Sequence, residues 1–180
     1  LAAIVDGTDI VLIGDEVYEH IIFDGRRHES LLRYPELRQR ACVISSFGKT
    51  FHTTGWKVGY CVAPRPILAE VQRVHQFMTF TVHTPSQFAF AEFVARDPMA
   101  KDLASFYQQK RDLFLQLIDG SRFRPLPCDG TYFQLLDYSA IADATDKDMA
   151  MRLITEHGVA SIPCSAFLYQ DPGGPVLRFC

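Results

Sequence analysis

One lysine of this sequence stands where a lysine can do chemistry. Lys49 follows the apolar run Ala41–Ser46 and lies directly behind a glycine, Gly48. Lysines are mostly exposed, so taken alone Lys49 is best interpreted as a solvated loop residue. A buried strand that ends just before it offers another setting, because partial desolvation leaves a neutral amine that can attack a carbonyl carbon. The neighbouring residues decide between these two interpretations.

Two nearby side chains are suited to hold a phosphate group. Ser46 lies three positions before Lys49, and Lys57 lies eight positions after it. A hydroxyl donor and a cation can together bind a phosphate dianion beside the lysine amine. This arrangement favours the functional interpretation of Lys49.

An acidic residue and a phenol follow the first apolar run of the chain. Ile10–Gly14 is short and continuously apolar, which predicts a buried strand that delivers Asp15 at its carboxyl end. A buried carboxylate can keep the nitrogen of a pyridine ring protonated, as carbanion stabilisation on that ring requires. Tyr18 can donate a hydrogen bond to a phenolate oxygen of the same ring. Without the lysine segment, Tyr18 would be an ordinary turn aromatic.

Strands followed by helices must position these residues. Further buried strands are predicted at Ala41–Ser46 and at Lys57–Ala63, the second of which is stopped by Pro64. Apolar residues at helical spacing predict a helix from Ile67 to about Phe80, and Pro85–Val94 predicts another with proline near its first turn. The first half of the chain therefore has the pattern of an α/β sheet.

Asp97–Pro98 breaks the helical region and predicts a domain boundary. We expect residues 1–97 to be the C-terminal portion of a large domain with a mixed sheet, and residues 98–180 to be a small α+β domain. Both chain ends look cut, because the chain begins with Leu and stops within a strand-like run. The elements predicted for the small domain are a helix from Leu103 to Leu117 that ends near Gly120, a strand at Gly130–Leu136, a helix at Asp146–His157 closed by Gly158, and strands at Val159–Ile162 and Val176–Phe179.

Composition excludes several classes of partner. Lys and Arg number 18 against 21 Asp and Glu, with no long run of either sign, so a nucleic-acid or anionic-membrane partner has little support. No stretch reaches the roughly 18 apolar residues of a membrane span. The five scattered cysteines predict free thiols in a reducing compartment, by default the cytoplasm. His52, His75 and His83 lack ligand spacing, so no metal site is predicted.

Three motifs together resemble the signature of the fold-type-I, class I/II aminotransferases, and the resemblance covers essentially the whole chain. The motifs are Asp15–Glu16–Val17–Tyr18, Ser45–Ser46–Phe47–Gly48–Lys49 and Gly55–Trp56–Lys57–Val58–Gly59–Tyr60. Within the family, the runs Lys49–Lys57 and Val74–Phe77 look closest to bacterial methionine aminotransferases and the related kynurenine and glutamine transaminases. The resemblance implies the C-terminal part of the pyridoxal-phosphate-dependent transferase fold.

The resemblance also implies a role for each residue already singled out. Lys49 would form the Schiff base with pyridoxal 5'-phosphate and shuttle the proton. Asp15 would contact the pyridine nitrogen, Tyr18 the phenolic oxygen, and Ser46 and Lys57 the phosphate. Many members carry arginine in place of Lys57, which would grip the phosphate with two hydrogen bonds, but the subgroup named above tends to have lysine.

Arg178, in the last apolar run, resembles the family's arginine that receives the α-carboxylate of the amino acid. The resemblance implies transamination between an amino acid, with methionine or an aromatic one favoured, and a 2-oxo acid. It also implies a homodimer with residues of both subunits in each site. The family's phosphate loop, ring-stacking aromatic and phenolic-oxygen asparagine cannot be located in these 180 residues. We therefore expect the chain alone to bind the cofactor weakly and to have little or no activity.

Two other functions stay open. A β-lyase acting on cysteine conjugates, or a relative of aminocyclopropane-carboxylate synthase, would use the same lysine and aspartate; a lyase would release ammonia and pyruvate without needing a 2-oxo acid. A binding module that retains only the fold is the second alternative. Its mark would be the loss of the residue equivalent to Lys49 or Asp15, and both residues are present.

Overall fold

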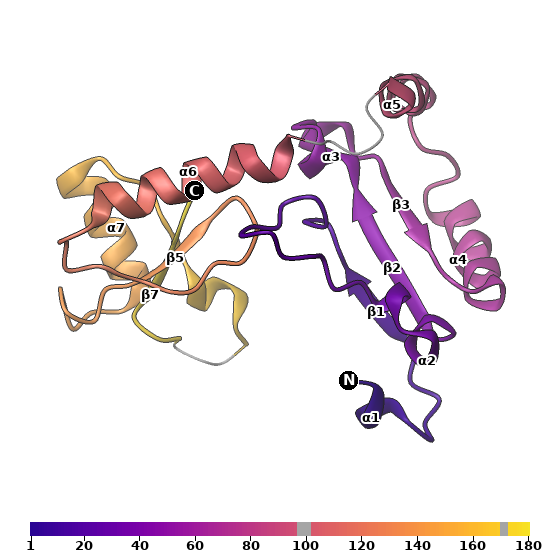
Figure 1. Ribbon diagram of the computed structural model, residues 1–180, viewed down its shortest axis with the longest axis horizontal. Helices are drawn as coiled ribbons and strands as arrows, with labels where there is room; N and C mark the ends of the chain where they lie inside the picture. Colours follow the sequence, from indigo (N-terminus) through magenta and orange to yellow (C-terminus); the bar gives the residue numbers. More distant parts are fainter. Residues whose placement is uncertain (97–101, 170–172) are drawn as a thin grey trace. The chain divides into compact units, whose positions relative to one another are not determined.

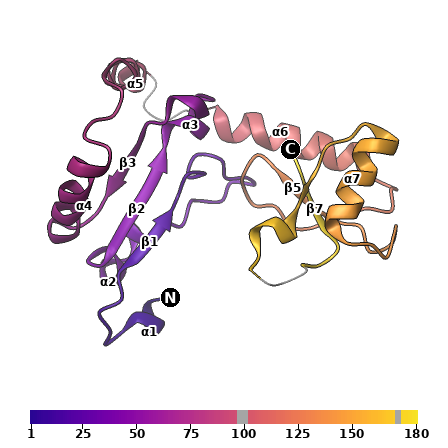
Figure 2. The same ribbon diagram turned by 180° about the vertical axis from the view of Figure 1, so that it is seen from behind.

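The computed structural model describes residues 1–96, 102–169 and 173–180. The chain divides into two compact units, Leu1–Leu103 and Ala104–Cys180 (Figure 1). The domain boundary predicted between residues 97 and 98 lies outside the described residues. The predicted α/β fold class is confirmed, because each unit combines helices with a sheet (Figures 1 and 2).

A three-stranded sheet organises the first unit. Its strands lie in the order β1 (Leu12–Asp15), β2 (Ala41–Ser46) and β3 (Gly59–Val62). β1 runs parallel to β2, with Asp15 opposite Ile44, and β3 runs antiparallel to β2, with Gly59 opposite Ser46. The carboxyl ends of β1 and β2 and the beginning of β3 therefore meet at the same end of the sheet.

Short helices connect these strands, and two longer helices follow them. The helices of this unit are α1 (Ala2–Val5), η1 (Leu31–Arg33), α2 (Pro35–Arg38), α3 (Phe47–Thr50), η2 (Thr54–Trp56), α4 (Arg65–Met78) and α5 (Thr84–Arg96). The two long helices agree with the sequence prediction. Each has a proline in its first turn, Pro66 in α4 and Pro85 in α5, where the missing N–H would have no partner within the helix.

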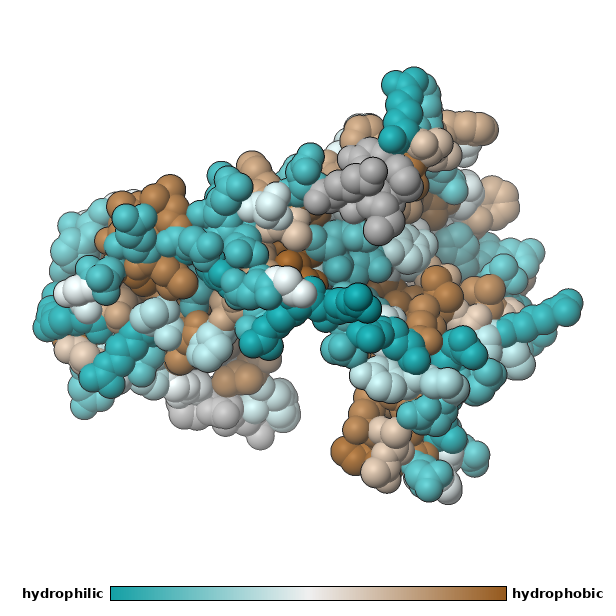
Figure 3. All heavy atoms as spheres, in the orientation of Figure 1, coloured by the Kyte–Doolittle hydropathy of each residue, from teal (hydrophilic) through white to brown (hydrophobic). Residues whose placement is uncertain are grey.

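β1 is less buried than its apolar sequence predicts. Ile13 is 73% exposed and Val11 is also exposed. β1 is an edge strand with a hydrogen-bonded neighbour on one side only, and alternate residues point to opposite faces, so Leu12 and Gly14 are the more buried pair. Figure 3 shows hydrophobic side chains at the surface of this unit. The prediction of a fully buried strand at Ile10–Gly14 was wrong on this point.

The second unit contains an antiparallel four-stranded sheet. Its strands lie in the order β4 (Arg124–Pro125), β5 (Gln134–Asp137), β7 (Val176–Phe179) and β6 (Ile162–Pro163). Its helices are α6 (Leu103–Ile118), which begins at the last residue of the first unit, α7 (Asp146–His157) and the short η3 (Cys164–Phe167). The core contains the buried residues Tyr138, Met149, Ala150, Leu153 and Leu177.

α7 has the bounds that the sequence predicts, because both of its ends are capped. The Thr145 hydroxyl accepts a hydrogen bond from the amide of Asp148 at 3.2 Å, and Gly158 closes the helix with φ +66°. The amide of Val159 donates to the carbonyl of Leu153 and so belongs to the end of the helix. For this reason β6 begins at Ile162 instead of at Val159.

Two other strands also begin later than predicted. β3 begins at Gly59 because Lys57 has the left-handed φ of +56°, which ends η2 and is incompatible with a strand. β5 begins at Gln134 because Thr131 has φ +74° and its hydroxyl donates to the carbonyl of Phe133 at 3.1 Å, which makes a turn. No described helix is long and apolar enough to span a membrane.

Candidate functional site

All the predicted site residues except Arg178 lie at one end of the sheet of the first unit. Asp15 is the last residue of β1, Ser46 is the last residue of β2, and Lys57 lies two residues before β3. Lys49 is in α3, just beyond Ser46, and Tyr18 is in the turn after Asp15. The sheet topology thus brings together residues from three segments that are separate in the sequence.

A local capping arrangement holds the lysine at this end. The hydroxyl of Ser46 accepts a hydrogen bond from the amide of Gly48 at 3.1 Å and starts α3, the turn that carries Lys49. Lys49 itself is half-buried. Gly48 is buried, and a Cβ there would lie only 3.0 Å from Thr54 Cα. The glycine before the lysine is therefore needed for close packing of the chain.

A second glycine brings β3 close to β2 beside the lysine turn. A Cβ at Gly59 would lie 2.5 Å from the carbonyl oxygen of Ser45, so no larger residue fits without a shift of the strand. Two residues before Gly59, Lys57 is exposed and has φ +56°. This backbone conformation costs a non-glycine residue of the order of 1–3 kcal/mol. Strain of this kind is found preferentially at ligand-binding sites.

An aromatic cluster, which the sequence analysis missed, fixes the lysine turn against α5. The ring of Phe47 stacks on Phe90 with centroids 4.9 Å apart, and the ring of Phe51 meets Phe93 edge-on at 5.0 Å. Trp56 also contacts Phe90, at 5.3 Å. Such pairs contribute about 0.5–1.5 kcal/mol each beyond their burial. The signal for this cluster in the sequence was the pair Phe47 and Phe51, which lie on either side of Lys49.

The buried carboxylate after β1 is Glu16, not Asp15. Asp15 is exposed, and its carboxylate accepts a hydrogen bond from the amide of Val17 at 3.3 Å. Successive strand residues face opposite sides, so the burial expected at Asp15 falls on its neighbour. Glu16 accepts hydrogen bonds from His28 Nε2 at 2.7 Å and from the amide of Leu31 at 3.0 Å. Burial raises the pKa of Glu16, but these hydrogen bonds outweigh it and hold the pKa below its ordinary value.

A second carboxylate, Glu19, also has protein partners. It accepts a hydrogen bond from the hydroxyl of Ser45 at 2.7 Å and another from the phenol of Tyr60. Burial, together with the neighbouring Glu19 carboxylate, raises the pKa of Tyr60 to about 12. The sequence analysis did not single out Glu16, Glu19 or Tyr60. The only available signal was the run of acidic residues around Tyr18.

Arg178 lies in the second unit, on β7 opposite Leu135. Its guanidinium carbon is 4.7 Å from the ring centroid of Phe133 and 5.3 Å from that of Phe167. Its buried Nε has no hydrogen-bond partner among the described residues. Aromatic faces of this kind attract the guanidinium and restrict its plane without using its N–H donors. These two aromatic contacts therefore do not occupy the N–H donors of the Arg178 guanidinium.

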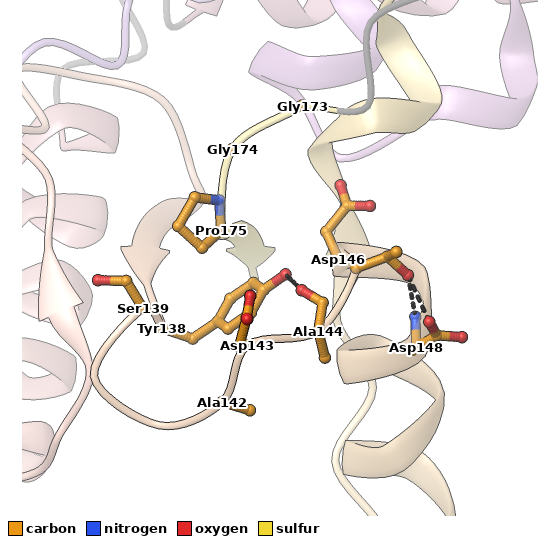
Figure 4. Close-up of a pocket in the computed structure, with 11 residues that line it drawn as sticks. Tyr138, Ser139, Ala142, Asp143, Ala144, Asp146, Asp148, Gly173, Gly174 and Pro175 are labelled. Carbon is orange, nitrogen blue, oxygen red and sulfur yellow. Dashed lines mark hydrogen bonds between the residues drawn. The ribbon is translucent and has the colours of Figure 1, made fainter.

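The second unit also has a cavity of about 700 Å³ whose lining includes none of the predicted site residues (Figure 4). Three oxygen atoms of its polar side chains already bond to the protein. The phenol of Tyr138 donates to the carbonyl of Ala144 at 2.8 Å, and both carboxylate oxygens of Asp146 accept hydrogen bonds from Ser165 at 2.6 Å. These bonds fix the loop before α7 and η3, so we assign this cavity no chemistry. No cluster that could hold a metal ion occurs among the described residues.

The aminotransferase resemblance predicts a lysine at the end of a strand in an α/β sheet. It also predicts an acidic residue, a phenol, a hydroxyl and a second lysine at the same end, and the sheet has all of these groups there. The family model described as "Aminotransferase class I and II" matches residues 1–180, so the chain belongs to this family. The family depends on pyridoxal phosphate.

Individual relatives agree with this assignment. The chain is 50% identical over 175 residues to a methionine aminotransferase of Escherichia coli (strain K12), covering 97% of this chain and 45% of the relative. It is 37% identical to a kynurenine–oxoglutarate transaminase of Dictyostelium discoideum, covering 92% of this chain and 42% of the relative. A crystal structure of an E. coli methionine aminotransferase superposes with a TM-score of 0.93 at 50% identity, covering 97% of this chain and 46% of that one. The chain thus spans a little under half the length of these relatives.

The polar groups at this end of the sheet fit pyridoxal phosphate. An amine suits its aldehyde, a carboxylate suits its ring nitrogen, a phenol suits its phenolic oxygen, and a hydroxyl with a lysine suits its phosphate. Thr53, in the loop after the lysine turn, has a buried hydroxyl without a hydrogen-bond partner among the described residues. A polar ligand group at this end of the sheet could satisfy it.

Proposed function

We propose that the protein containing this chain transfers an amino group between an amino acid and a 2-oxo acid with pyridoxal phosphate, and that methionine or an aromatic amino acid is the favoured donor. The observation that carries this proposal is the position of Lys49 at the same end of the sheet as Asp15, Ser46 and Lys57. The names of the E. coli and D. discoideum relatives support the choice of donors.

Each residue has a defined task in this proposal. Lys57 and Ser46 would hold the phosphate, Asp15 would keep the ring nitrogen protonated, and Tyr18 would donate a hydrogen bond to the phenolic oxygen. When bound, pyridoxal phosphate supplies an aldehyde for amines and a ring that stabilises negative charge at the α-carbon of the amino acid. The rest of the chemistry is proton transfer and binding by the protein.

Lys49 and Arg178 would act on the amino acid itself. The amine of Lys49 would remove the α-proton of the amino acid and deliver it to the carbon that carried the aldehyde. The guanidinium of Arg178 would bind the α-carboxylate with two parallel hydrogen bonds, and Phe133 and Phe167 support this by restricting its plane.

We further propose that the full-length protein is a cytoplasmic homodimer with residues of both subunits in each site. The exposed side chains of Phe77, Met78 and Phe80, each at least 80% accessible, support an interface at the end of α4. The five cysteines are all free thiols, which supports a reducing compartment.

Product analysis tests the proposed reaction. The full-length protein is incubated with pyridoxal phosphate, methionine and a 2-oxo acid, and the products are separated. We expect a new amino acid to appear only when the 2-oxo acid is present, and Lys49→Ala to abolish its formation. Lys147→Ala, on the exposed surface of α7, is the matched control and should retain the activity. Release of ammonia and pyruvate from cysteine conjugates without a 2-oxo acid, in the absence of transamination, would instead indicate a β-lyase.

A further inference from the structure

Glu19 joins three parts of the first unit at the functional end of its sheet. It lies in the turn after β1 and accepts hydrogen bonds from Ser45 near the end of β2 and from Tyr60 near the beginning of β3. Ser45 and Tyr60 lie directly opposite each other on the two strands. Ser45 is only 2% exposed, so the donor of its hydrogen bond to Glu19 is buried. One carboxylate therefore ties the turn to both neighbouring strands.

The position of this link in the sequence connects it to the site. Glu19 follows Tyr18, and Ser45 precedes Ser46, the residue that caps the lysine turn. Adjacent strand residues point to opposite faces, so the Ser45 side chain lies on the face of β2 opposite to that of Ser46. The Glu19–Ser45 hydrogen bond thus lies on the face of β2 opposite to Ser46. It connects Glu19, which follows Tyr18, with Ser45, which precedes Ser46.

The other end of the same turn is also fixed. The amide of Glu16 continues the ladder of β1 by donating to the carbonyl of Ile44 at 2.8 Å, and its carboxylate binds His28 and Leu31. Between Glu16 and Glu19, the turn contains Val17 and Tyr18. Tyr18 is therefore carried by a short span that polar contacts hold at both of its ends.

We propose that Glu19 is a positioning residue that fixes the Tyr18 phenol relative to the lysine turn, and so sets the hydrogen bond that Tyr18 donates to the bound cofactor. The inference rests on the proposed function. One carboxylate oxygen of Glu19, Oε1, accepts from both the Ser45 hydroxyl and the Tyr60 phenol, and its negative charge strengthens both hydrogen bonds. A glutamine would retain an acceptor oxygen but not this charge. An apolar residue would bury surface but would not set the orientation of the turn.

Hydrogen exchange without cofactor measures the link itself. In Glu19→Ala we expect the backbone amides of residues 16–20 to exchange about tenfold faster or more. Hydrogen bonds to a charged acceptor stabilise the closed state of the segment by a free energy equivalent to at least about a tenfold change in opening. The matched control is Glu70→Ala, which removes an exposed carboxylate paired with Arg73 on α4 and should leave this segment unchanged. Should Glu19→Ala fail to fold, Ser45→Ala and Tyr60→Phe each remove one donor and should give a smaller effect in the same segment.

A double-variant comparison on the cofactor-bound full-length protein then tests the connection to Tyr18. Loss of a hydrogen bond to the phenolic oxygen changes the pH midpoint of the visible absorption band of the cofactor. We expect Glu19→Ala and Tyr18→Phe to shift this midpoint in the same direction, and the double variant to shift no further than Tyr18→Phe alone. A purely structural role of Glu19 would leave the midpoint unchanged.

Each outcome has a defined meaning. A Glu19→Ala shift that persists in full on top of Tyr18→Phe, or exchange of residues 16–20 that equals the parent, overturns the inference. If the parent shows no visible band that depends on Lys49, the proposed function fails and the inference falls with it, whatever the exchange data show. A normal parent band together with an unshifted Glu19→Ala midpoint overturns the positioning role alone.

Discussion

In the second unit, the side chains of Tyr138 and Leu177 are completely buried between the sheet and α7, whereas in the first unit the strand residues Ile13 and Ile44 are exposed. The first unit does bury Ile21 and Phe23, which follow the turn that carries Tyr18. Ala41, Cys42 and Val43, in the first half of β2, are buried as well. The unit with the predicted chemistry is also the one that leaves more strand surface uncovered.

This difference indicates how the two units are organised. The second unit has one continuous core, and polar groups such as Asp146 are paired within it. The first unit holds its functional end with directed contacts, namely the hydrogen bonds of Glu16 and Glu19 and the ring stacking of Phe47 on Phe90. Exposed apolar surface of the kind around Ile13 marks a face that another protein surface can cover.

The largest expected effect is the difference in free energy of unfolding between Leu177→Ala and Ile13→Ala. Leu177 is fully buried, so its truncation leaves a cavity and should lower the free energy of unfolding of the second unit by about 2–5 kcal/mol. Ile13 is 73% exposed, and its truncation should change the free energy of unfolding of the first unit by less than about 0.5 kcal/mol. Chemical denaturation followed by hydrogen exchange of each unit measures both. Equal losses would show that Ile13 is covered in the native protein.

A pH-dependent effect is expected from Glu16→Gln. Because the pKa of Glu16 is lower in the folded state, its stabilising contribution is present above its ordinary pKa of about 4.5 and is lost as the pH falls through the folded value. At pH near 7 the variant should be less stable by about 1–2 kcal/mol, since its hydrogen bonds lose a charged acceptor. The difference between parent and variant should disappear in acid. A difference that stays constant with pH would contradict this account of Glu16.

The smallest effect is expected in the second unit, from Thr145→Ala. Removing the hydroxyl leaves the amide of Asp148 without its cap at the start of α7, which costs about 1 kcal/mol. Thr145→Ser keeps the cap and should be close to neutral. Thermal unfolding of the two variants, measured in parallel, separates loss of the cap from loss of the methyl group. Equal stability of both variants would rule out a capping role.

Local patterns predicted several elements well. β2, α7 and β7 have the predicted bounds, because an apolar run with polar ends or a pair of helix caps is contained within a few residues. Two of the places where the prediction failed, the beginnings of β3 and β5, have positive φ at non-glycine residues, Lys57 and Thr131, which sequence patterns do not reveal.

The candidate site could be predicted only in part. Lys49, Ser46 and Asp15 follow apolar runs, so their position at strand ends was visible in the sequence. Glu19 was not predictable, since its partners lie 26 and 41 residues away in the chain and meet it only through the sheet register. The rings that flank Arg178 come from two other segments of the second unit and leave no local pattern.

The most direct test of the central claim is to locate the cofactor on the chain. Pyridoxal phosphate is added to the full-length protein, borohydride reduction makes the bond permanent, and peptide mass mapping identifies the labelled lysine. We predict a single label on Lys49, a visible absorption band that is absent from Lys49→Ala, and no label on Lys57. Labelling of Lys57 or of many lysines without preference, with the band unchanged in Lys49→Ala, would contradict the account.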